Sequence, residues 1–238
     1  MTKLSRLLAF LLALAAISSA RAADSFTPAQ RAEIVHIMRD ALKQDPTILR
    51  DAFAALQARA DGADKARLLA RGAAGLVRPG DPVEGNPHGS TTIVEFFDVR
   101  CPFCRRMEPD MAALLRRDHR VKLVLIDLPI LGPASVLASR ALLAAQQQGG
   151  YAKLRAALMT APPDITEAAI EQAARANGLD WARLRRDMAA PAVMARLKAN
   201  LALADQLGID GTPALVAGRQ IVPGAVGLSD LEKLAAAN

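Results

Sequence analysis

The sequence predicts an α/β fold with a helical insertion, preceded by a helical N-terminal arm. Two observations predict the α/β domain: strand-like and helical segments alternate from residue 82 onward, and the strand pattern returns before the C-terminus. The third is a succession of Ala- and Leu-rich segments over residues 134–207, which predicts the insertion. The chain accordingly divides into a leader (1–22), an arm (24–60), a linker (61–81) and the α/β domain (82–238).

Residues 1–22 have the features of a secretory signal peptide. Lys3 and Arg6 precede an unbroken apolar run over residues 7–17 that is too short to span a bilayer, and Ala20-Arg21-Ala22 offers a small-residue cleavage site. The alternative is an uncleaved anchor. We expect cleavage and an exported protein, in a compartment where disulfides persist.

The composition indicates a globular, mostly helical protein. Hydrophobic residues make up 52% of the chain, largely Ala and Leu, and aromatic residues only 3%. The net charge of +6 falls to +3 without the three cations of the leader, because no acid leaves with them. The sequence has no dense basic run with interleaved aromatic residues, so we expect no nucleic-acid binding and place the arginines on solvated helix faces.

The arm, residues 24–60, is expected to form two amphipathic helices. Thr27 is a suitable N-cap before Pro28, and Asp45-Pro46 restarts the second helix. The apolar stripes are Ile34, Ile37, Met38 and Leu42 in the first helix and Ile48, Leu49, Ala52, Phe53 and Leu56 in the second. Because two helices this short bury little apolar surface by themselves, we expect them to pack on the main domain or on another copy of the chain. We expect an oligomerisation arm, and a plain extension is the alternative.

Residues 61–81 carry the turn and breaker signals of a linker. Asp61-Gly62, Gly72, Gly75 and Pro79-Gly80 are such signals, while residues 65–76 retain helical character. The linker is therefore expected to be part helix and part loop.

The α/β domain opens with a strand, a helix and a strand. Residues 91–97 and 121–126 are apolar and β-branched, as buried strands are, and a helix separates them. This order predicts a parallel pair with a right-handed crossover, and Val83-Glu84 is expected to join the sheet.

Five helices are expected in the insertion, interrupted by glycines and prolines. Their ranges are 134–148, 151–160, 165–177, 181–188 and 193–207. Thr166 or Asp164 can cap the third helix, and Tyr151 and Trp181 are expected to be packing residues.

The chain ends with a hairpin and a helix. Residues 214–217 and 220–222 flank a two-residue Gly218-Arg219 turn, and residues 228–236 form a helix capped by Ser229 or Asp230. Strand, helix, strand, helical insertion, hairpin and helix together make a thioredoxin-like topology.

The two cysteines of the chain, Cys101 and Cys104, lie where the first strand ends and the helix begins. The free N–H groups and dipole of a helix N-terminus stabilise a thiolate at Cys101, which is the attacking species in disulfide exchange, and Cys104 can resolve a mixed disulfide. A structural zinc site needs four ligands, and His36, His88 and His119 lie far apart in sequence. The pair is therefore interpreted as redox active, with two-coordinate copper or a chance pair as alternatives, and we expect no metal or other cofactor.

Glu95 lies within the first strand, six positions before Cys101. A carboxylate in an apolar strand is costly to ionise, so we expect a raised pKa for Glu95 and a role in relaying a proton to Cys104. The alternative is a hydrogen-bonded or edge acid.

Three stretches resemble the DsbA-like branch of the thioredoxin superfamily. They are residues 94–98 before Cys101-Pro102-Phe103-Cys104, residues 129–135, and Gly211-Thr212-Pro213-Ala214. The helical arm and the phrase Phe-Phe-Asp-x-x-Cys-Pro-Phe-Cys resemble the ScsC-type proteins, in which the arm can drive self-association. The chain departs from the pattern at Val99, where Tyr is common.

The resemblance implies roles for the residues around the dithiol. Cys101 is then the attacking thiolate and Cys104 the resolving thiol, while Pro213 is a cis-proline facing them and Thr212 tunes the sulfurs. A cis-proline exposes backbone to which an extended substrate can pair as a strand. Pro102 and Phe103 set the redox poise, and together with Thr212 and Pro213 they are expected to bind the substrate.

No histidine lies between the cysteines to stabilise a thiolate by charge. Arg100, Arg105 and Arg106 are candidates to do so from outside the motif, although exposed charges are screened. We expect an oxidising couple, though not the most oxidising of its family.

Three functions remain open at this point. The first is an oligomeric periplasmic disulfide isomerase that acts on exported proteins with cysteines and is re-reduced by a membrane partner. The second is a DsbA-like dithiol oxidase, and the third is a copper-binding chaperone that uses the cysteine pair. We favour the isomerase, because an oligomer places several sites around one cavity.

Overall fold

The computed structural model describes residues 26–238, and the predicted signal peptide lies outside them. The chain divides into two units, Met1–Ala58 and Arg59–Asn238, and the boundary between them falls within a helix. The described part of the first unit consists of α2 (Pro28–Gln44) and the first half of α3 (Thr47–Ala70).

The start of α2 is fixed by a reciprocal cap. The Gln30 N–H donates to Thr27 Oγ1 at 3.3 Å, and the Thr27 N–H donates to Gln30 Oε1 at 2.9 Å. Asp45 ends α2 and its carboxylate accepts from the Thr47 N–H at 2.9 Å, where α3 begins. These contacts confirm the predicted cap and the predicted restart, and α2 has no buried residue.

The turn expected at Asp61-Gly62 is absent, because α3 continues to Ala70. A glycine within a helix costs only about 1 kcal/mol relative to alanine, and good helix formers surround this one. Residues 73–76 then form the 3₁₀ helix η1 (Ala73–Leu76), whose Ala73 and Leu76 are buried in the second unit. Much of the expected linker is therefore an ordered part of the second unit.

The second unit is built on a mixed sheet. Its five strands are β1 (Val83–Gly85), β2 (Thr91–Phe97), β3 (Val121–Asp127), β4 (Ala214–Ala217) and β5 (Gln220–Pro223). They lie in the order β1-β3-β2-β4-β5, with β2 and β3 parallel and the other pairs antiparallel. The predicted parallel pair and hairpin are confirmed.

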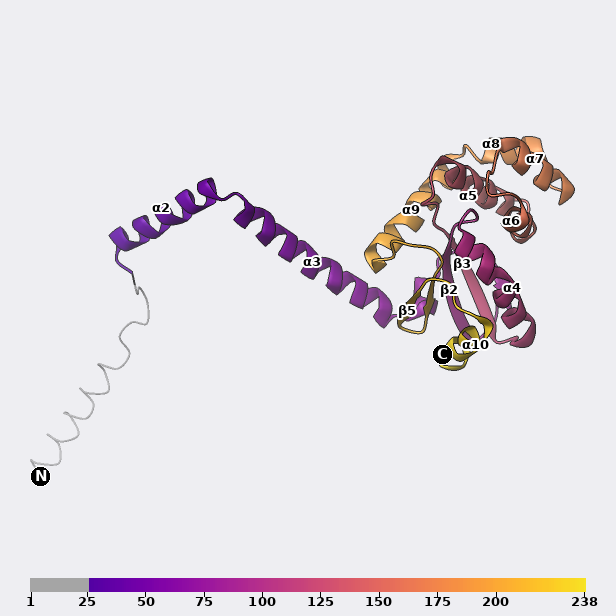
Figure 1. Cartoon of the computed structure of the whole chain (residues 1–238), viewed down its shortest axis with the longest axis horizontal. Coiled ribbons are helices and arrows are strands. Elements are labelled where there is room, and N and C mark those ends of the chain that lie inside the picture. The colour runs from indigo at the N-terminus through magenta and orange to yellow at the C-terminus, as the bar shows by residue number, and fades with distance from the viewer. Residues whose placement is uncertain (1–25) are drawn as a thin grey trace, which may run out of the picture. The chain divides into compact units, whose positions relative to one another are not determined.

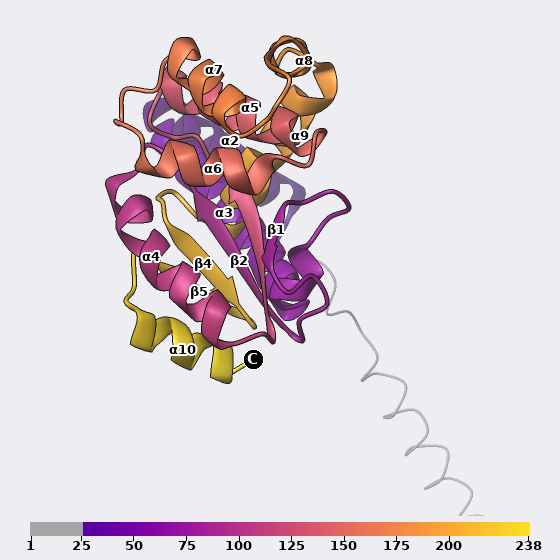
Figure 2. The same cartoon turned by 90° about the vertical axis from the view of Figure 1, so that its right-hand side faces the viewer.

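The helices of the second unit follow the predicted order. They are α4 (Pro102–Arg117), α5 (Pro133–Gln146), α6 (Tyr151–Thr160), α7 (Glu167–Ala176), α8 (Trp181–Asp187), α9 (Pro191–Leu207) and α10 (Leu228–Ala236). The α4 and α9 helices lie on opposite sides of β2 and β3 (Figure 1), and α5 to α8 gather beyond one end of the strands (Figure 2). This is the predicted α/β, thioredoxin-like architecture with a helical insertion.

Alternation along β2 separates two cores. Ile93 and Phe97 pack with α4 and α10, whereas Val94 and Phe96 pack with η1 and the C-terminal part of α9. Because successive side chains of a strand point to opposite faces, Glu95 projects to the α4 side with Ile93 and Phe97.

The helix caps are partly as predicted. The Thr166 hydroxyl accepts from the Ala169 N–H and caps α7, as expected. The cap predicted at Ser229 or Asp230 is wrong, because α10 begins at Leu228 after an extended Gly227 that has no side chain to contribute.

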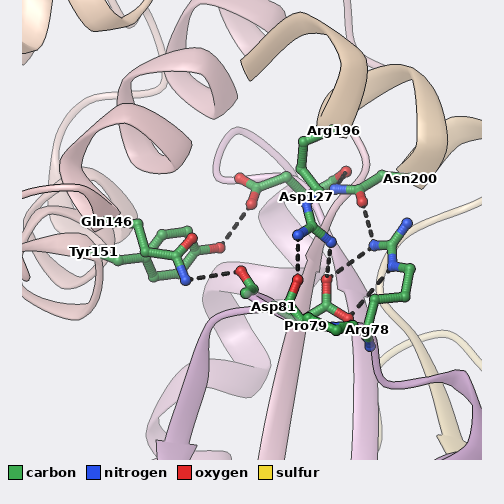
Figure 3. A network of polar contacts seen from close by, with 9 residues as sticks. Arg78, Pro79, Asp81, Asp127, Gln146, Tyr151, Arg196 and Asn200 are labelled. Carbon is green, nitrogen blue, oxygen red and sulfur yellow. Dashed lines mark hydrogen bonds and ion pairs between the residues drawn. The ribbon is translucent and has the colours of Figure 1, made fainter. Parts of the chain in front are cut away.

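A polar network joins the segment before β1 to α9 (Figure 3). Arg78 and Arg196 both donate to Asp81 Oδ1, at 3.0 and 2.9 Å. Asn200 accepts from Arg78 and donates to the Asp127 carbonyl oxygen at 3.1 Å. The network fixes this segment against the end of β3.

Candidate active site at the start of helix α4

The cysteine pair lies at the turn between β2 and α4. The Cys101 N–H donates to the Asp98 carbonyl oxygen at 2.9 Å, which closes the turn, and Cys101 is the N-cap of α4. Pro102 takes the first helical position, where its missing N–H leaves no hydrogen bond unmade. Cys104 therefore lies in the first turn of α4, as the sequence predicts.

Both cysteines are buried free thiols, and Cys101 contacts a loop far along the chain. Its Sγ donates to the Thr212 carbonyl oxygen at 3.1 Å. The Thr212–Pro213 peptide bond is cis, as the resemblance implies. The structure thus brings Cys101, Cys104, Thr212 and Pro213 together.

Cys104 is the more deeply buried of the two cysteines. Burial raises the pKa of the Cys104 thiol well above its usual range, and the nearby Glu95 carboxylate raises it further. A thiol in this state remains protonated near neutral pH. Cys104 therefore needs a base before it can act as a nucleophile.

Glu95 lies on the α4 side of β2 with 1% of its surface exposed. Burial raises the pKa of Glu95 from 4.5 to about 7, against the opposing effect of the Arg155 charge. Its Oε2 has no hydrogen-bond partner and lies 3.6 Å from Arg155 Nη2. The expected rise in pKa is confirmed, and a carboxyl that titrates near neutral pH can give or take a proton.

Arg155, which the sequence analysis placed on a solvated helix face, is instead buried at 1% exposure. Its two terminal nitrogens donate to the Glu108 carboxylate at 2.8 and 2.6 Å. The guanidinium also lies over the Phe97 ring at 4.8 Å. The signal was present in the sequence, since Arg155 falls on the apolar stripe of α6 between Leu154 and Leu158.

A second buried acid was also missed. The Tyr151 hydroxyl donates to Asp127 Oδ2 at 2.7 Å (Figure 3), at the end of β3. Burial raises the pKa of Asp127 to about 7, although the Tyr151 hydrogen bond opposes the shift. Tyr151 and Trp181 are buried, as their predicted packing role requires.

Two arginines next to the cysteines bind main-chain carbonyl oxygens. Arg100 donates to the carbonyls of Pro163 and Leu131, and Arg105 donates to those of Val99 at 2.6 Å, Leu158 at 3.0 Å and Ala161. These contacts join the dithiol turn to the loops around it. Stabilisation of a Cys101 thiolate by the charges of Arg100, Arg105 and Arg106 stays a prediction.

A groove of ≈ 610 Å³ lies beside the dithiol. Phe103 and Met107 of α4 line one side, and Thr212, Pro213 and the loop over residues 223–227 line the other. Phe103 is half exposed, and Arg106 lies over its ring at 5.1 Å. The mostly apolar lining of the groove suits the side chains of a bound polypeptide segment.

A dithiol at a strand–helix turn, facing a cis-proline loop on a mixed sheet, defines the class of thioredoxin-fold dithiol proteins. Residues 92–236 match the model of the DSBA-like thioredoxin domain, and the chain belongs to this family. Residues 30–61 match the model described as the copper resistance protein ScsC N-terminal domain. Both parts of the predicted resemblance are confirmed.

Solved structures agree with this assignment. A thioredoxin-like oxidoreductase from Silicibacter pomeroyi DSS-3 is 44% identical, with 67% of this chain and 92% of that chain covered and a TM-score of 0.65. Proteus mirabilis ScsC in a transitional conformation is 27% identical, with 90% of this chain and 96% of that chain covered and a TM-score of 0.63. A periplasmic thioredoxin-like protein from Salmonella enterica serovar Typhimurium is 28% identical, with coverages of 71% and 95% and a TM-score of 0.61.

Two curated relatives are much longer than this chain. The Na(+)/H(+) antiporters NhaA 3 of Salinispora tropica and NhaA 1 of Salinispora arenicola are each 30% identical over 175 residues, which is 69% of this chain. The match takes in 27% of each antiporter, so the likeness concerns one segment of those proteins. Within residues 26–238 of this chain, no helix has the length and apolar character needed to cross a membrane.

Proposed function

We propose that this protein is an exported thiol–disulfide oxidoreductase that exchanges disulfides with cysteine-containing protein substrates. One observation carries the proposal: Cys101 is the N-cap residue of α4, and its thiol donates a hydrogen bond to the Thr212 carbonyl oxygen, beside the cis bond to Pro213. The thiolate of such a cysteine is the species that attacks a disulfide in exchange chemistry.

The first step is attack by the Cys101 thiolate on one sulfur of a substrate disulfide. A bond forms between Cys101 Sγ and that sulfur, and the substrate S–S bond breaks. The other substrate sulfur leaves as a thiolate and takes a proton from water. Pro102, Phe103, Thr212 and Pro213 are the residues we assign to substrate binding, because they surround Cys101 or line the groove.

The second step distinguishes reduction from isomerisation. In reduction, Cys104 gives its proton to Glu95 and attacks Cys101 Sγ, which forms the Cys101–Cys104 disulfide and releases the substrate thiolate. In isomerisation, another thiolate of the substrate attacks the mixed disulfide and restores free Cys101. Oxidation of a substrate dithiol is the reduction sequence run backwards, with Cys104 as the leaving thiolate.

The arm supports the isomerase direction. Its large apolar side chains Ile34, Ile37, Met38, Ile48, Leu49, Phe53 and Leu56 are exposed within the first unit. A second copy of the arm is the partner we assign to them, because helices of this size are marginal in water without apolar packing. Several sites held around one cavity retain a misfolded substrate, and a membrane partner keeps them reduced.

The remaining parts of the chain fit export. We assign residues 1–22 to a cleaved leader, residues 24–60 to the oligomerisation arm, residues 61–81 to the connection and residues 82–238 to the redox domain. Periplasmic localisation is supported by the similar periplasmic protein of Salmonella enterica.

Two other functions remain candidates. A DsbA-like oxidase uses the same residues in the opposite direction, and the match to a DSBA-like domain favours it. A copper chaperone is favoured by the match of residues 30–61 to a domain of a copper resistance protein, since Cu(I) prefers two thiolates.

Reactivation of a scrambled-disulfide test protein, with reduced glutathione present, distinguishes these functions. The isomerase is supported by strong reactivation that Cys101→Ser abolishes. Weak reactivation by a preparation that still oxidises a dithiol peptide overturns the isomerase in favour of the oxidase. Retained copper without any disulfide exchange overturns both in favour of the chaperone.

A further inference from the structure

We propose that Arg155 is a positioning residue for this exchange chemistry, which sets the pH at which Glu95 can accept the proton of Cys104. The effect on the Cys104 step rests on the proposed function, whereas the effect of Arg155 on the protonation of Glu95 is measurable by itself. It concerns a residue of the helical insertion that touches neither cysteine.

Arg155 brings together carboxylates from three elements of the sheet domain. It lies on α6 and reaches Glu84 of β1 at 3.4 Å, Glu95 of β2 at 3.6 Å and Glu108 of α4 at 2.6 Å. One buried cation thus serves three acids. Full ionisation of all three acids leaves two uncompensated negative charges, which is costly at a buried site.

The geometry indicates which acid holds a proton. Glu108 takes the two-pronged contact with the guanidinium, and the side chains of Glu84 and Glu108 remain 21% and 24% exposed. Glu95 is 1% exposed, and its Oε2 has no hydrogen-bond donor. Glu95 is therefore the acid that is most easily protonated, and its ionised form depends on the Arg155 charge.

The charges around Glu95 act in opposite directions on its proton. Burial and the negative charges of Glu108 and Glu84 raise the pKa of Glu95, and the positive charge of Arg155 lowers it; the net result is a pKa of about 7. The other titratable groups facing this cluster are Cys101 and Cys104 of the dithiol turn, Asp127 of β3 and Tyr151 of α6. The Arg155 charge also lowers the pKa of Asp127 and of Tyr151, so the measurement must follow the Glu95 carboxyl specifically.

Two substitutions therefore have opposite effects. Arg155→Met removes the cation, so the pKa of Glu95 rises by about 1 to 3 units and Glu95 is already protonated at neutral pH. It then cannot accept the Cys104 proton, and the resolving step moves to higher pH. Glu108→Gln removes a competing anion and frees Arg155 for Glu95, so the pKa of Glu95 falls and the resolving step moves to lower pH.

The experiment measures both effects in the full chain. Infrared difference spectra against Glu95→Gln follow the protonated carboxyl band of Glu95 with pH. Separately, a mixed disulfide of Cys101 with glutathione is prepared, and the rate of glutathione release by Cys104 is measured from pH 5 to pH 9.

Each experiment gives a midpoint pH, one for the infrared titration of Glu95 and one for the rate of glutathione release. We expect both midpoints to rise in Arg155→Met, to return toward the wild-type value in Arg155→Lys, and to fall in Glu108→Gln. Midpoints that shift in the same direction in Arg155→Met and Glu108→Gln overturn the proposal. The charge effect of Arg155 requires opposite shifts in the two variants, whereas general damage to the fold shifts both midpoints the same way. Glu108→Gln keeps the test decisive if Arg155→Met does not fold, since an unchanged midpoint in Glu108→Gln also overturns the proposal. Glutathione that stays bound in every variant refutes the proposed function, while the infrared titration still decides the role of Arg155.

Discussion

Replacing Glu95 with glutamine is expected to stabilise the protein above neutral pH and to leave its stability nearly unchanged in acid. Glutamine has the size of a protonated glutamate but cannot ionise. The wild-type protein must either keep a proton on Glu95 or bury a charge, and the second option becomes necessary as the pH rises.

The magnitude follows from the shift in the pKa of Glu95. Burial raises this pKa from 4.5 to about 7, and each unit corresponds to about 1.4 kcal/mol, so the shift corresponds to about 3 kcal/mol. Because the folded state holds the proton more tightly than the unfolded state, wild-type stability falls as the pH rises from 4.5 through 7. The advantage of Glu95→Gln grows over this window and is constant above it.

The assay is urea unfolding of wild-type and Glu95→Gln protein at a series of pH values from 4 to 8.5. Both proteins are kept reduced and at one concentration, so that disulfide formation and association do not differ between them. Subtracting the two curves removes the contribution of Asp127, which titrates in the same range. Parallel curves over the whole range would refute the assignment of a buried, costly charge to Glu95.

The remaining predictions concern the arm and the second buried acid. Phe53→Glu is expected to dissociate the proposed oligomer into monomers in light scattering, because Phe53 is 72% exposed within its unit and its burial in the proposed interface would contribute about 2 kcal/mol or more. Ala54→Glu adds the same charge on the opposite side of the helix and is the control, so equal dissociation by both would count against the apolar stripe. Tyr151→Phe is expected to lower the free energy of unfolding by about 1 to 3 kcal/mol, because it removes the hydrogen bond that the Tyr151 hydroxyl donates to the buried Asp127 carboxyl. An unchanged urea midpoint above pH 7, where Asp127 is ionised, would show that this hydrogen bond is not needed.

The fold was largely predictable because long apolar patterns are set by burial on one face. The ranges 151–160 and 228–236 match α6 and α10, and the hairpin around Gly218-Arg219 was placed correctly. Errors lie where a local signal competes with context. Gly62 lies within α3 because helix formers surround it, and Gly227 precedes α10 without any capping side chain.

The candidate site was predictable only where chemistry is concentrated in a short stretch. The cysteine pair, Glu95 and the Thr212-Pro213 dipeptide each stand out in the sequence. The only sequence signal for Arg155 is its position on the apolar stripe of α6, and its three carboxylate partners, which come from β1, β2 and α4, are not apparent from the sequence. Only the packing of the insertion against the sheet domain brings these groups together.

The most direct test of the central claim is to trap the intermediate of the exchange reaction. The Cys104→Ser variant of the full chain is incubated with a protein that contains a disulfide, and the products are separated without reductant and mapped by mass spectrometry. We expect a covalent adduct joined through Cys101 that dithiothreitol releases. If no adduct forms although Cys101 remains open to alkylation, the protein does not act by thiol–disulfide exchange at this cysteine.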